Sequence, residues 1–532
     1  MVLRIGLVLV ALAVVIGIPF AMKPAQPEGA DGRGNADRLV IVSPHNEAIR
    51  HEFTAAFRRH HRERTGRDVV VDWRIPGGTS EIARYLASEF TASFRNEWVN
   101  RMGKAWDATV DGAFDNPSVA PAADTPAGAA RRAFLASSAG IGIDLFFGGG
   151  AYDFIQQAGA GRLVDSGVVA AHPEWFNDAV IPQNVSGEPF YDPAGLWIGT
   201  AVSSFGICYN TDSLERLGVT DIPASWDALA DPRLARQVAL ADPTQSGSIA
   251  KAFEQIIQQK MQQHAAGAAG NEETAVHEGW LAGLGLIQRI SANARFFTDS
   301  GAKVPLDVSQ GDAAAGMCID FYGRFQSEAV RLDDGSSRLQ YFTPLGGSSV
   351  GVDPIAMLRG APHPAVARAF IEFVLSEAGQ KIWNFKVGAP GGPGRFALRR
   401  LPVRKDFYIP ANEPFRSDPG VDPYEEARHF TYRAAWTAPL FRVISFAIRT
   451  MSIDAHQEQA GAWRALADAG FPPQATARFS DLSAFDYRMC VEKILPVLRS
   501  PDRLGEVRLA RELGDRFRRQ YEEAADLARR GL

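Results

Sequence analysis

Short β-rich runs alternate with helical patterns along the first part of this chain, and this alternation limits its fold more than any other feature. LVIV at 39–42 precedes a helical pattern from about Glu47, VVVDW at 69–73 precedes one from about Ser80, and IDLFF follows at 143–147. Alternation of this kind is typical of an α/β sheet with helical crossovers.

A second pattern indicates two lobes. The 532 residues exceed the roughly 250 to 300 that one core usually holds. Two extended segments, GLWIGTAVSSFGICYN at 195–210 and YFTPLGGSSVGVDPIAMLRG at 341–360, enclose a central α/β block. We therefore expect a bilobal α/β protein whose lobes are joined by extended crossings and enclose a cleft. The predicted division is a signal or anchor segment with linker at 1–37, a first lobe at 38–200 with a surface insertion at about 92–140, a second lobe at 201–343, a return to the first lobe at 344–400, and a mainly helical carboxyl-terminal extension at 401–532.

The amino-terminal segment has the pattern of an export signal. The segment from Ile5 to Met22 holds no charge and follows Arg4. As a helix it would span roughly 27 Å, close to the ~30 Å of a bilayer's hydrocarbon core, so a cleaved signal peptide and a retained membrane anchor are both consistent with it. Residues 23–37 are polar and rich in Pro and Gly, which indicates a flexible tether. We expect an exported protein of the periplasm or cell envelope.

Charge and motifs argue against several other classes of protein. A net charge of −5 does not favour nucleic acid as a partner, and three cysteines are too few for a disulfide framework. The sequence contains no GxxxxGK[ST], HExxH or CxxC motif. Gly347, Ser349 and Gly351 satisfy GxSxG, but a strand-like run follows where a nucleophile elbow needs a helix. We expect no enzyme activity and no cofactor.

Polar turns mark the candidate site. SPHN at 43–46 and PGGTS at 76–80 each connect a strand to a helix, so both lie at the sheet edge where open α/β sheets bind ligands. DPTQSGSIAKAFEQII at 242–257 begins a further helix, with Ser246 or Ser248 as its N-cap. These serines either cap the helix only or, together with free amides, form half of an anion site.

At family level, the chain resembles extracellular solute-binding proteins of bacterial ABC importers, with the type II periplasmic-binding-protein fold. It is similar to the branch that binds ferric ion, phosphonates and sugar phosphates. The resemblance rests on LVIVSPHNEAIRHEF, DLFFGGGAYDF, GICYNTDSL, ADPTQSGSIAKAFE, AAGMCIDFYGR and VGVDPIAMLRGAPHPAVARAFIEFVLSEAGQKIW, in that order along the chain. It implies a ligand held between the lobes, an ABC permease as partner, and a monomer. The residues that it assigns to the ligand are Ser43, His45, Asn46, Thr79, Ser80, Gly149, Gly150, Ser203, Ser204, Ser246, Gly247, Ser248, Asp320, Tyr322 and Asp353.

The ligand class follows from these residue types. Hydroxyls and helix-start amides from both lobes suit phosphate, phosphonate or carboxylate groups. Ferric-binding members place two adjacent tyrosines where this chain has Phe321 and Tyr322. We therefore expect a site without a metal ion, and a ferric site of His45, Asp320 and Tyr322 is the alternative. A membrane-anchored ligand sensor is a further alternative from another class.

Overall fold

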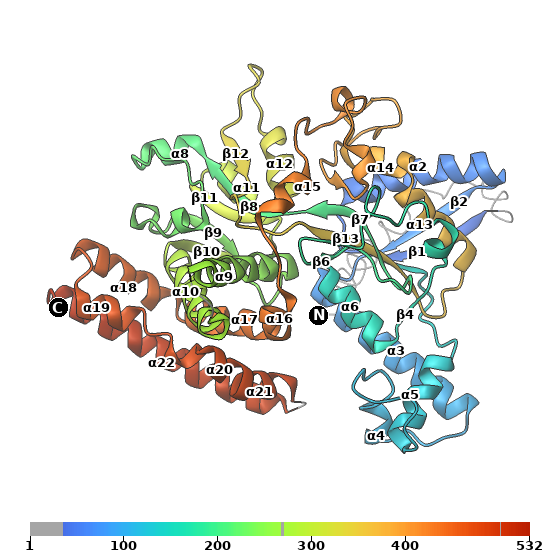
Figure 1. Ribbon diagram of the computed structural model, residues 1–532, viewed down its shortest axis with the longest axis horizontal. Coiled ribbons are helices and arrows are strands. Elements are labelled where there is room, and N and C mark those ends of the chain that lie inside the picture. Colours follow the sequence, from blue (N-terminus) through green and yellow to red (C-terminus); the bar gives the residue numbers. More distant parts are fainter. Residues whose placement is uncertain (1–35, 268–270, 501) are drawn as a thin grey trace, which may run out of the picture.

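The computed structural model describes residues 36–267, 271–500 and 502–532, and two α/β lobes lie side by side in it (Figure 1). The first lobe is built on a seven-stranded sheet in the order β14-β7-β13-β3-β1-β2, with β4 also paired to β13. Its strands are β1 (Asp37–Val42), β2 (Val69–Arg74), β3 (Leu145–Phe147), β4 (Leu163–Val164), β7 (Ile198–Ser203), β13 (Gly351–Leu358) and β14 (Leu401–Pro402). β1 is parallel to β2 and β3, whereas β13 is antiparallel to β3 and β7.

Helices follow the three parallel strands β1, β2 and β3, as the alternating pattern predicts. They are α2 (Glu47–Thr65), α3 (Thr79–Asn96) and α6 (Ala151–Ala160). Three further helices, α7 (Val168–Ala171), α13 (Pro364–Leu375) and α14 (Glu377–Asn384), follow the antiparallel strands β4 and β13. The core between α2 and the sheet is aromatic: the Phe53 ring lies 6.0 Å from that of Phe147 and 4.4 Å from that of Trp383. The two-stranded hairpin of β5 (Asn184–Val185) and β6 (Glu188–Pro189) lies just before β7.

The second lobe contains a five-stranded sheet in the order β10-β9-β11-β8-β12. Its elements are β8 (Phe205–Asn210), α8 (Thr211–Arg216), β9 (Val238–Ala241), α9 (Gly247–Gly267), α10 (Glu272–Ala292), β10 (Ala294–Thr298), α11 (Lys303–Gln310), β11 (Ala315–Ile319), α12 (Asp320–Ala329) and β12 (Leu339–Phe342). The crossings are β7 to β8 and β12 to β13, as the two extended segments predicted. Only Ser204 separates β7 from β8, so the first crossing is a nearly continuous extended chain.

A third segment also connects the lobes. Ala427 belongs to the buried core of the first lobe, whereas Trp436 and Leu440 belong to that of the second. The backbone N–H of Tyr432 donates to Ser186 O at 2.7 Å, and Ser186 Oγ donates to Ala427 O at 2.6 Å. We call residues 427–441 the strap.

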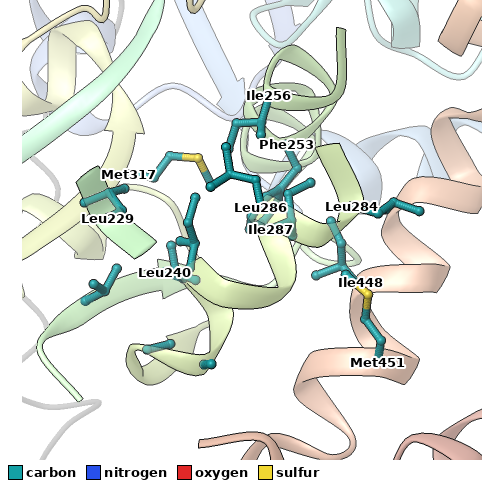
Figure 2. Packing of buried hydrophobic residues seen from close by; sticks show 14 of the residues in the cluster. Leu229, Leu240, Phe253, Ile256, Leu284, Leu286, Ile287, Met317, Ile448 and Met451 are labelled. Atoms are coloured by element: carbon teal, nitrogen blue, oxygen red, sulfur yellow. The ribbon is translucent and has the colours of Figure 1, made fainter. Parts of the chain in front are cut away.

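The region after residue 400 is mainly helical, as predicted, although its first two residues form β14 in the first sheet. Its helices are α15 (Pro423–Glu426), α16 (Ala434–Thr437), α17 (Phe441–Ile448), α18 (His456–Asp468), α19 (Pro473–Phe479), α20 (Tyr487–Met489), α21 (Leu495–Arg499) and α22 (Arg503–Arg529). Buried residues from α17 onward join one hydrophobic core with the second lobe, and Figure 2 shows Ile448 and Met451 beside Leu284 of α10. These helices therefore form an additional layer of that lobe.

The predicted surface insertion forms helices α4 (Ala108–Asp111) and α5 (Pro126–Ala136) beyond the end of α3, at the lower right of Figure 1. Its buried aromatic residues extend the core of the first lobe: the Phe114 ring lies 5.2 Å from that of Phe94 in α3 and 5.1 Å from that of Phe134. Among the helices of residues 36–267, 271–500 and 502–532, none has the length and apolarity of a membrane span. The predicted signal or anchor segment, Ile5 to Met22, lies outside these residues.

Candidate ligand-binding cleft

A cavity of about 500 Å³ lies between the two lobes. Ten of the fifteen predicted site residues line it: His45, Thr79, Gly149, Gly150, Ser203, Ser246, Gly247, Ser248, Tyr322 and Asp353. The turns after β3 and before α3 approach each other closely, because a Cβ at Gly149 would come within 2.6 Å of Thr79 Cγ2. Gly149 has a φ of +125°, which also favours glycine at this position.

Five helices begin at this cavity after a turn or a strand: α3 and α6 from the first lobe, and α9, α11 and α12 from the second. A sixth, α17, also begins at the cavity, with Phe441, but it continues directly from the 3-10 helix Ala438–Leu440. Four of the first five, α3, α6, α11 and α12, have no side-chain hydrogen bond at the N-cap. The fifth, α9, is capped by Ser246, whose Oγ accepts from Ile249 N at 3.5 Å and lies 3.2 Å from Ser248 Oγ. Each helix start directs the positive end of its dipole towards the cavity. The same wall carries three cationic side chains and six acidic ones, which are Lys251, Lys303 and Arg400, and Glu81, Asp153, Glu188, Glu254, Asp299 and Asp353.

A buried charged group forms the floor of the cleft on the first-lobe side. Asp353 accepts a hydrogen bond from Gly149 N at 2.5 Å, forms an ion pair with Arg400, and lies 3.4 Å from His45 Nε2. Burial alone would raise the pKa of Asp353, but Arg400 and His45 outweigh it and hold the pKa at about 2. Burial lowers the pKa of His45, so this imidazole is neutral near pH 7.

Arg400 also reaches the second lobe. Its guanidinium carbon lies 4.1 Å from the ring centre of Phe321, which is in the first turn of α12, and 5.3 Å from that of Trp383. One of its nitrogens donates to Ser203 Oγ at 3.2 Å. Arg400 is 1% exposed and its Nε has no hydrogen-bond partner.

A second cation, partly buried, lies on α9. Lys251 Nζ is 2.9 Å from Glu188 Oε1, which belongs to the first lobe, and 2.9 Å from Glu254 Oε2 on its own helix. It also lies 3.4 Å from the ring centre of Tyr432, in the strap. Burial alone would lower the pKa of Lys251, but the two carboxylates raise it, so the ammonium is charged. An ion pair thus joins the lobes beside the cavity.

A ring contact joins the two lobes at the wall of the cleft. The ring of Tyr152, in the first turn of α6, lies 4.6 Å from that of Phe441 at the start of α17. Next to it, Asp153 faces Gly247 across the cleft, since a Cβ on that glycine would be 3.8 Å from Asp153 Oδ2. Burial raises the pKa of Asp153 to about 7.

The other five predicted residues do not line the cleft. Ser43 Oγ accepts from His45 N at 3.0 Å, and Asn46 Oδ1 caps α2 by accepting from Ile49 N at 3.1 Å, so both serve local structure. Ser80 is the second residue of α3, and its side chain is not part of the cavity wall. Ser204 faces away from the cleft, and its Oγ lies 3.1 Å from Thr343 Oγ1. Asp320 is fully buried beneath the start of α12, and burial raises its pKa.

Several lining residues were absent from the sequence prediction. They include Arg400, Lys251, Phe321, Tyr432, Phe441 and Asp153. Lys251 follows Ser246 and Ser248 by about one helical turn, so the helical pattern at 242–257 could have identified it. Arg400, Tyr432 and Phe441 lie beyond the segments that resemble the family, and only the folded chain brings them to the cleft.

The two lobes, their crossings and the polar cleft between them define a solute-binding protein with the type II periplasmic-binding-protein fold. Residues 142–415 match the profile of the bacterial extracellular solute-binding proteins, and the chain belongs to this family.

Curated relatives match over part of the chain. A 245-residue stretch is 25% identical to an uncharacterized protein of Haemophilus influenzae and covers 45% of this chain and 60% of that protein. A 185-residue stretch is 27% identical to the phosphoglycerate transport regulatory protein PgtC of Salmonella typhimurium and covers 35% of this chain and 40% of that protein. In both cases the match spans less than two thirds of the relative's length.

Solved structures with a similar architecture include the periplasmic binding protein AfuA of Actinobacillus pleuropneumoniae with bound fructose-6-phosphate. It is 17% identical with a TM-score of 0.45, and the match covers 70% of this chain and 86% of AfuA. Iron-bound HitA of Pseudomonas aeruginosa is 18% identical with a TM-score of 0.44, and the match covers 77% of this chain and 98% of HitA.

Proposed function

We propose that the protein captures a small anionic solute, bearing a phosphate, phosphonate or carboxylate group, in the interlobe cleft and delivers it to an ABC permease. The observation that carries this proposal is the convergence of five helix starts from both lobes on one cavity. Each helix start contributes about 0.3 to 1 kcal/mol towards an anion, and each charge-assisted hydrogen bond about 1.5 to 3 kcal/mol. A few such contacts suffice for micromolar affinity.

Closure supports the role in delivery. Ion pairs and ring contacts join the lobes at the cleft, as Lys251 with Glu188 and Tyr152 with Phe441 illustrate. A solute that contacts both walls binds the closed form better than the open form and so shifts the population towards it. In this proposal, the permease recognises the closed form.

The ferric alternative fits the cleft less well. Arg400 lies next to Asp353 and His45, so a fixed positive charge lies where a ferric ion would have to bind. Asp320, one of the three ligands of that alternative, does not line the cavity. In the described part of the chain, no group of three or more His, Cys, Asp or Glu side chains is arranged to hold a metal ion.

The test is isothermal titration calorimetry with 3-phosphoglycerate, inorganic phosphate and ferric citrate. The name of PgtC makes 3-phosphoglycerate a suitable first probe. We expect the phosphorylated probe to bind, and the double variant Ser246→Ala with Ser248→Ala to bind it about tenfold more weakly through loss of two hydroxyls. Binding of ferric citrate alone, lost in Tyr322→Phe, would replace the proposal with the ferric one.

The membrane-anchored sensor is a second candidate, because the relative PgtC is named a phosphoglycerate transport regulatory protein. In a sensor, the closed form would pass its signal to another envelope protein. Deletion of the gene would then leave solute uptake by an existing permease intact and abolish its induction, whereas loss of uptake itself supports the transport role.

A further inference from the structure

A second cavity, of about 520 Å³, lies behind the crossings. Neighbouring residues of the crossings line different cavities. Ser203 and Ser349 line the cleft, whereas Ser204 and Ser348 line the second cavity. Successive side chains of an extended chain point to opposite faces, so the two cavities lie on opposite sides of one hinge. We call the second one the hinge cavity.

The two side walls of the hinge cavity come from different lobes. Arg324 and Ser327 of α12, Arg331 and β12 form the second-lobe wall, and Arg399, Asp418 and Glu426 form the first-lobe wall. Figure 1 shows α12 and α15 near each other beside the crossings. Arg399 bridges the walls: its Nη2 donates to Asp418 Oδ1 at 2.5 Å and its Nη1 to Arg324 O at 3.0 Å.

Arg324 supplies an unused positive edge. Its side chain is 9% exposed, its ion pair with Asp320 Oδ2 is 3.6 Å long, and its Nη1 has no hydrogen-bond partner. Arg331 adds a second guanidinium at the rim; its side chain is 52% exposed, and its Nε lies 3.4 Å from Glu328 Oε2. Both arginines belong to the cavity wall, so together they place positive charge beside a ligand in the cavity.

Glu426 supplies the complementary negative edge. Glu426 belongs to the same cavity wall, and among the described residues its Oε2 finds no hydrogen-bond partner. Burial, with Asp320 and Asp422 nearby, raises the pKa of Glu426, while Arg324 acts in the opposite direction. A cationic group placed beside Glu426 would stabilise its charged form.

We propose that the hinge cavity is a second ligand site for a small zwitterion such as an α-amino acid, with the ligand's carboxylate at Arg324 and Arg331 and its ammonium group at Glu426. The volume lies within the range of small-molecule pockets. The occupant contacts both lobes in the closed arrangement, so it favours that arrangement and increases the affinity of the cleft for its own solute.

The test is titration calorimetry of the full chain with glycine, L-serine and L-glutamine, and with acetate and methylammonium as single-charge controls. We expect at least one amino acid to bind and both controls to bind at least about tenfold more weakly, because each engages only one edge of the site. Glu426→Gln, which keeps the shape of the side chain, and Arg331→Gln at the rim should each weaken the amino acid about tenfold or more.

The double variant Ser246→Ala with Ser248→Ala is the matched control and should bind the amino acid unchanged, so this experiment is independent of the solute of the cleft. Failure of all three amino acids to bind at millimolar concentration overturns the proposal. Binding that survives both Glu426→Gln and Arg331→Gln also overturns it, as does acetate binding as tightly as an amino acid.

Discussion

At the scale of single residues, charge pairing decides what the cleft can bind. Asp353 neutralises Arg400, and Glu188 with Glu254 surrounds Lys251, so neither cation is free. In the proposed complex, the attraction for an anion would therefore come mainly from the helix starts, and the paired cations would set the position of the anion.

Asp353→Asn tests the floor of the cleft. The substitution leaves Arg400 buried without its partner, and we expect the free energy of unfolding at pH 7 to fall by about 3 to 5 kcal/mol. Denaturant unfolding measures the change. Asp72→Asn, in the surface ion pair with Arg38, is the control and should cost less than about 1 kcal/mol; an equal loss in both variants contradicts the assignment.

The lowered pKa of Asp353 also predicts a pH dependence. A carboxyl whose pKa is lower in the folded than in the unfolded protein contributes stability above its unfolded pKa of about 4, and that contribution is lost as the pH falls towards 2. The contribution is about 2 kcal/mol. Unfolding measured at pH 5, 4 and 3 should show the loss in the wild type and a smaller one in Asp353→Asn.

Asp153 makes binding depend on pH in the neutral range. Its pKa of about 7 means that the carboxyl becomes charged as the pH rises through neutrality, opposite the start of α9. A negative charge there repels an anionic solute, so affinity should fall between pH 6 and pH 8. Titration calorimetry at both values, on wild type and Asp153→Asn, checks this; a slope that persists in the variant contradicts the role of Asp153.

At the scale of elements, the strap forms a wall of the cleft that the matched family region, 142–415, does not include. Tyr432 donates its hydroxyl to Glu254 Oε1 at 2.9 Å while its ring lies under Lys251. Thr437 Oγ1 donates to the same oxygen at 2.5 Å. The strap thus fixes the position of the ammonium group.

Substitutions at Tyr432 separate the two contributions of this side chain. Tyr432→Phe keeps the ring and loses the hydroxyl, so we expect solute affinity to fall only a few-fold, whereas Tyr432→Ala should reduce it about tenfold or more by freeing Lys251. Calorimetry with 3-phosphoglycerate measures both. Equal losses in the two variants would assign the effect to the hydroxyl alone.

Periodicity and turn chemistry allowed much of each element, and part of the site, to be predicted. The alternating pattern predicted the strands and helices around SPHN and PGGTS, and the SGS turn lies at the start of α9 in the cleft. A one-residue step along an extended chain reverses the direction of a side chain, so Ser203 and Ser204 could not be separated without the register of β7. Arg400 and Tyr432 reach the cleft through long-range packing, which has no local pattern in the sequence.

At the scale of the whole molecule, the carboxyl-terminal helices and the second lobe share one core, so they should unfold together. Ile448 of α17 and Leu284 of α10 are fully buried in that core, whereas Phe57 is buried in the core of the first lobe. Leu or Ile to Ala in a core costs about 2 to 5 kcal/mol and Phe to Ala about 3 to 5 kcal/mol. Each substitution should therefore lower the transition of its own lobe.

Differential scanning calorimetry measures these transitions. We expect Ile448→Ala and Leu284→Ala to lower the same transition, and Phe57→Ala to lower the other one or, if the lobes unfold as a unit, to shift the single transition by a comparable amount. A separate low-temperature transition that moves only in Ile448→Ala would mean that the helices after residue 441 unfold as an independent domain. The shared core argues against independent unfolding of these helices, because removing them would expose the buried face of α10 to water.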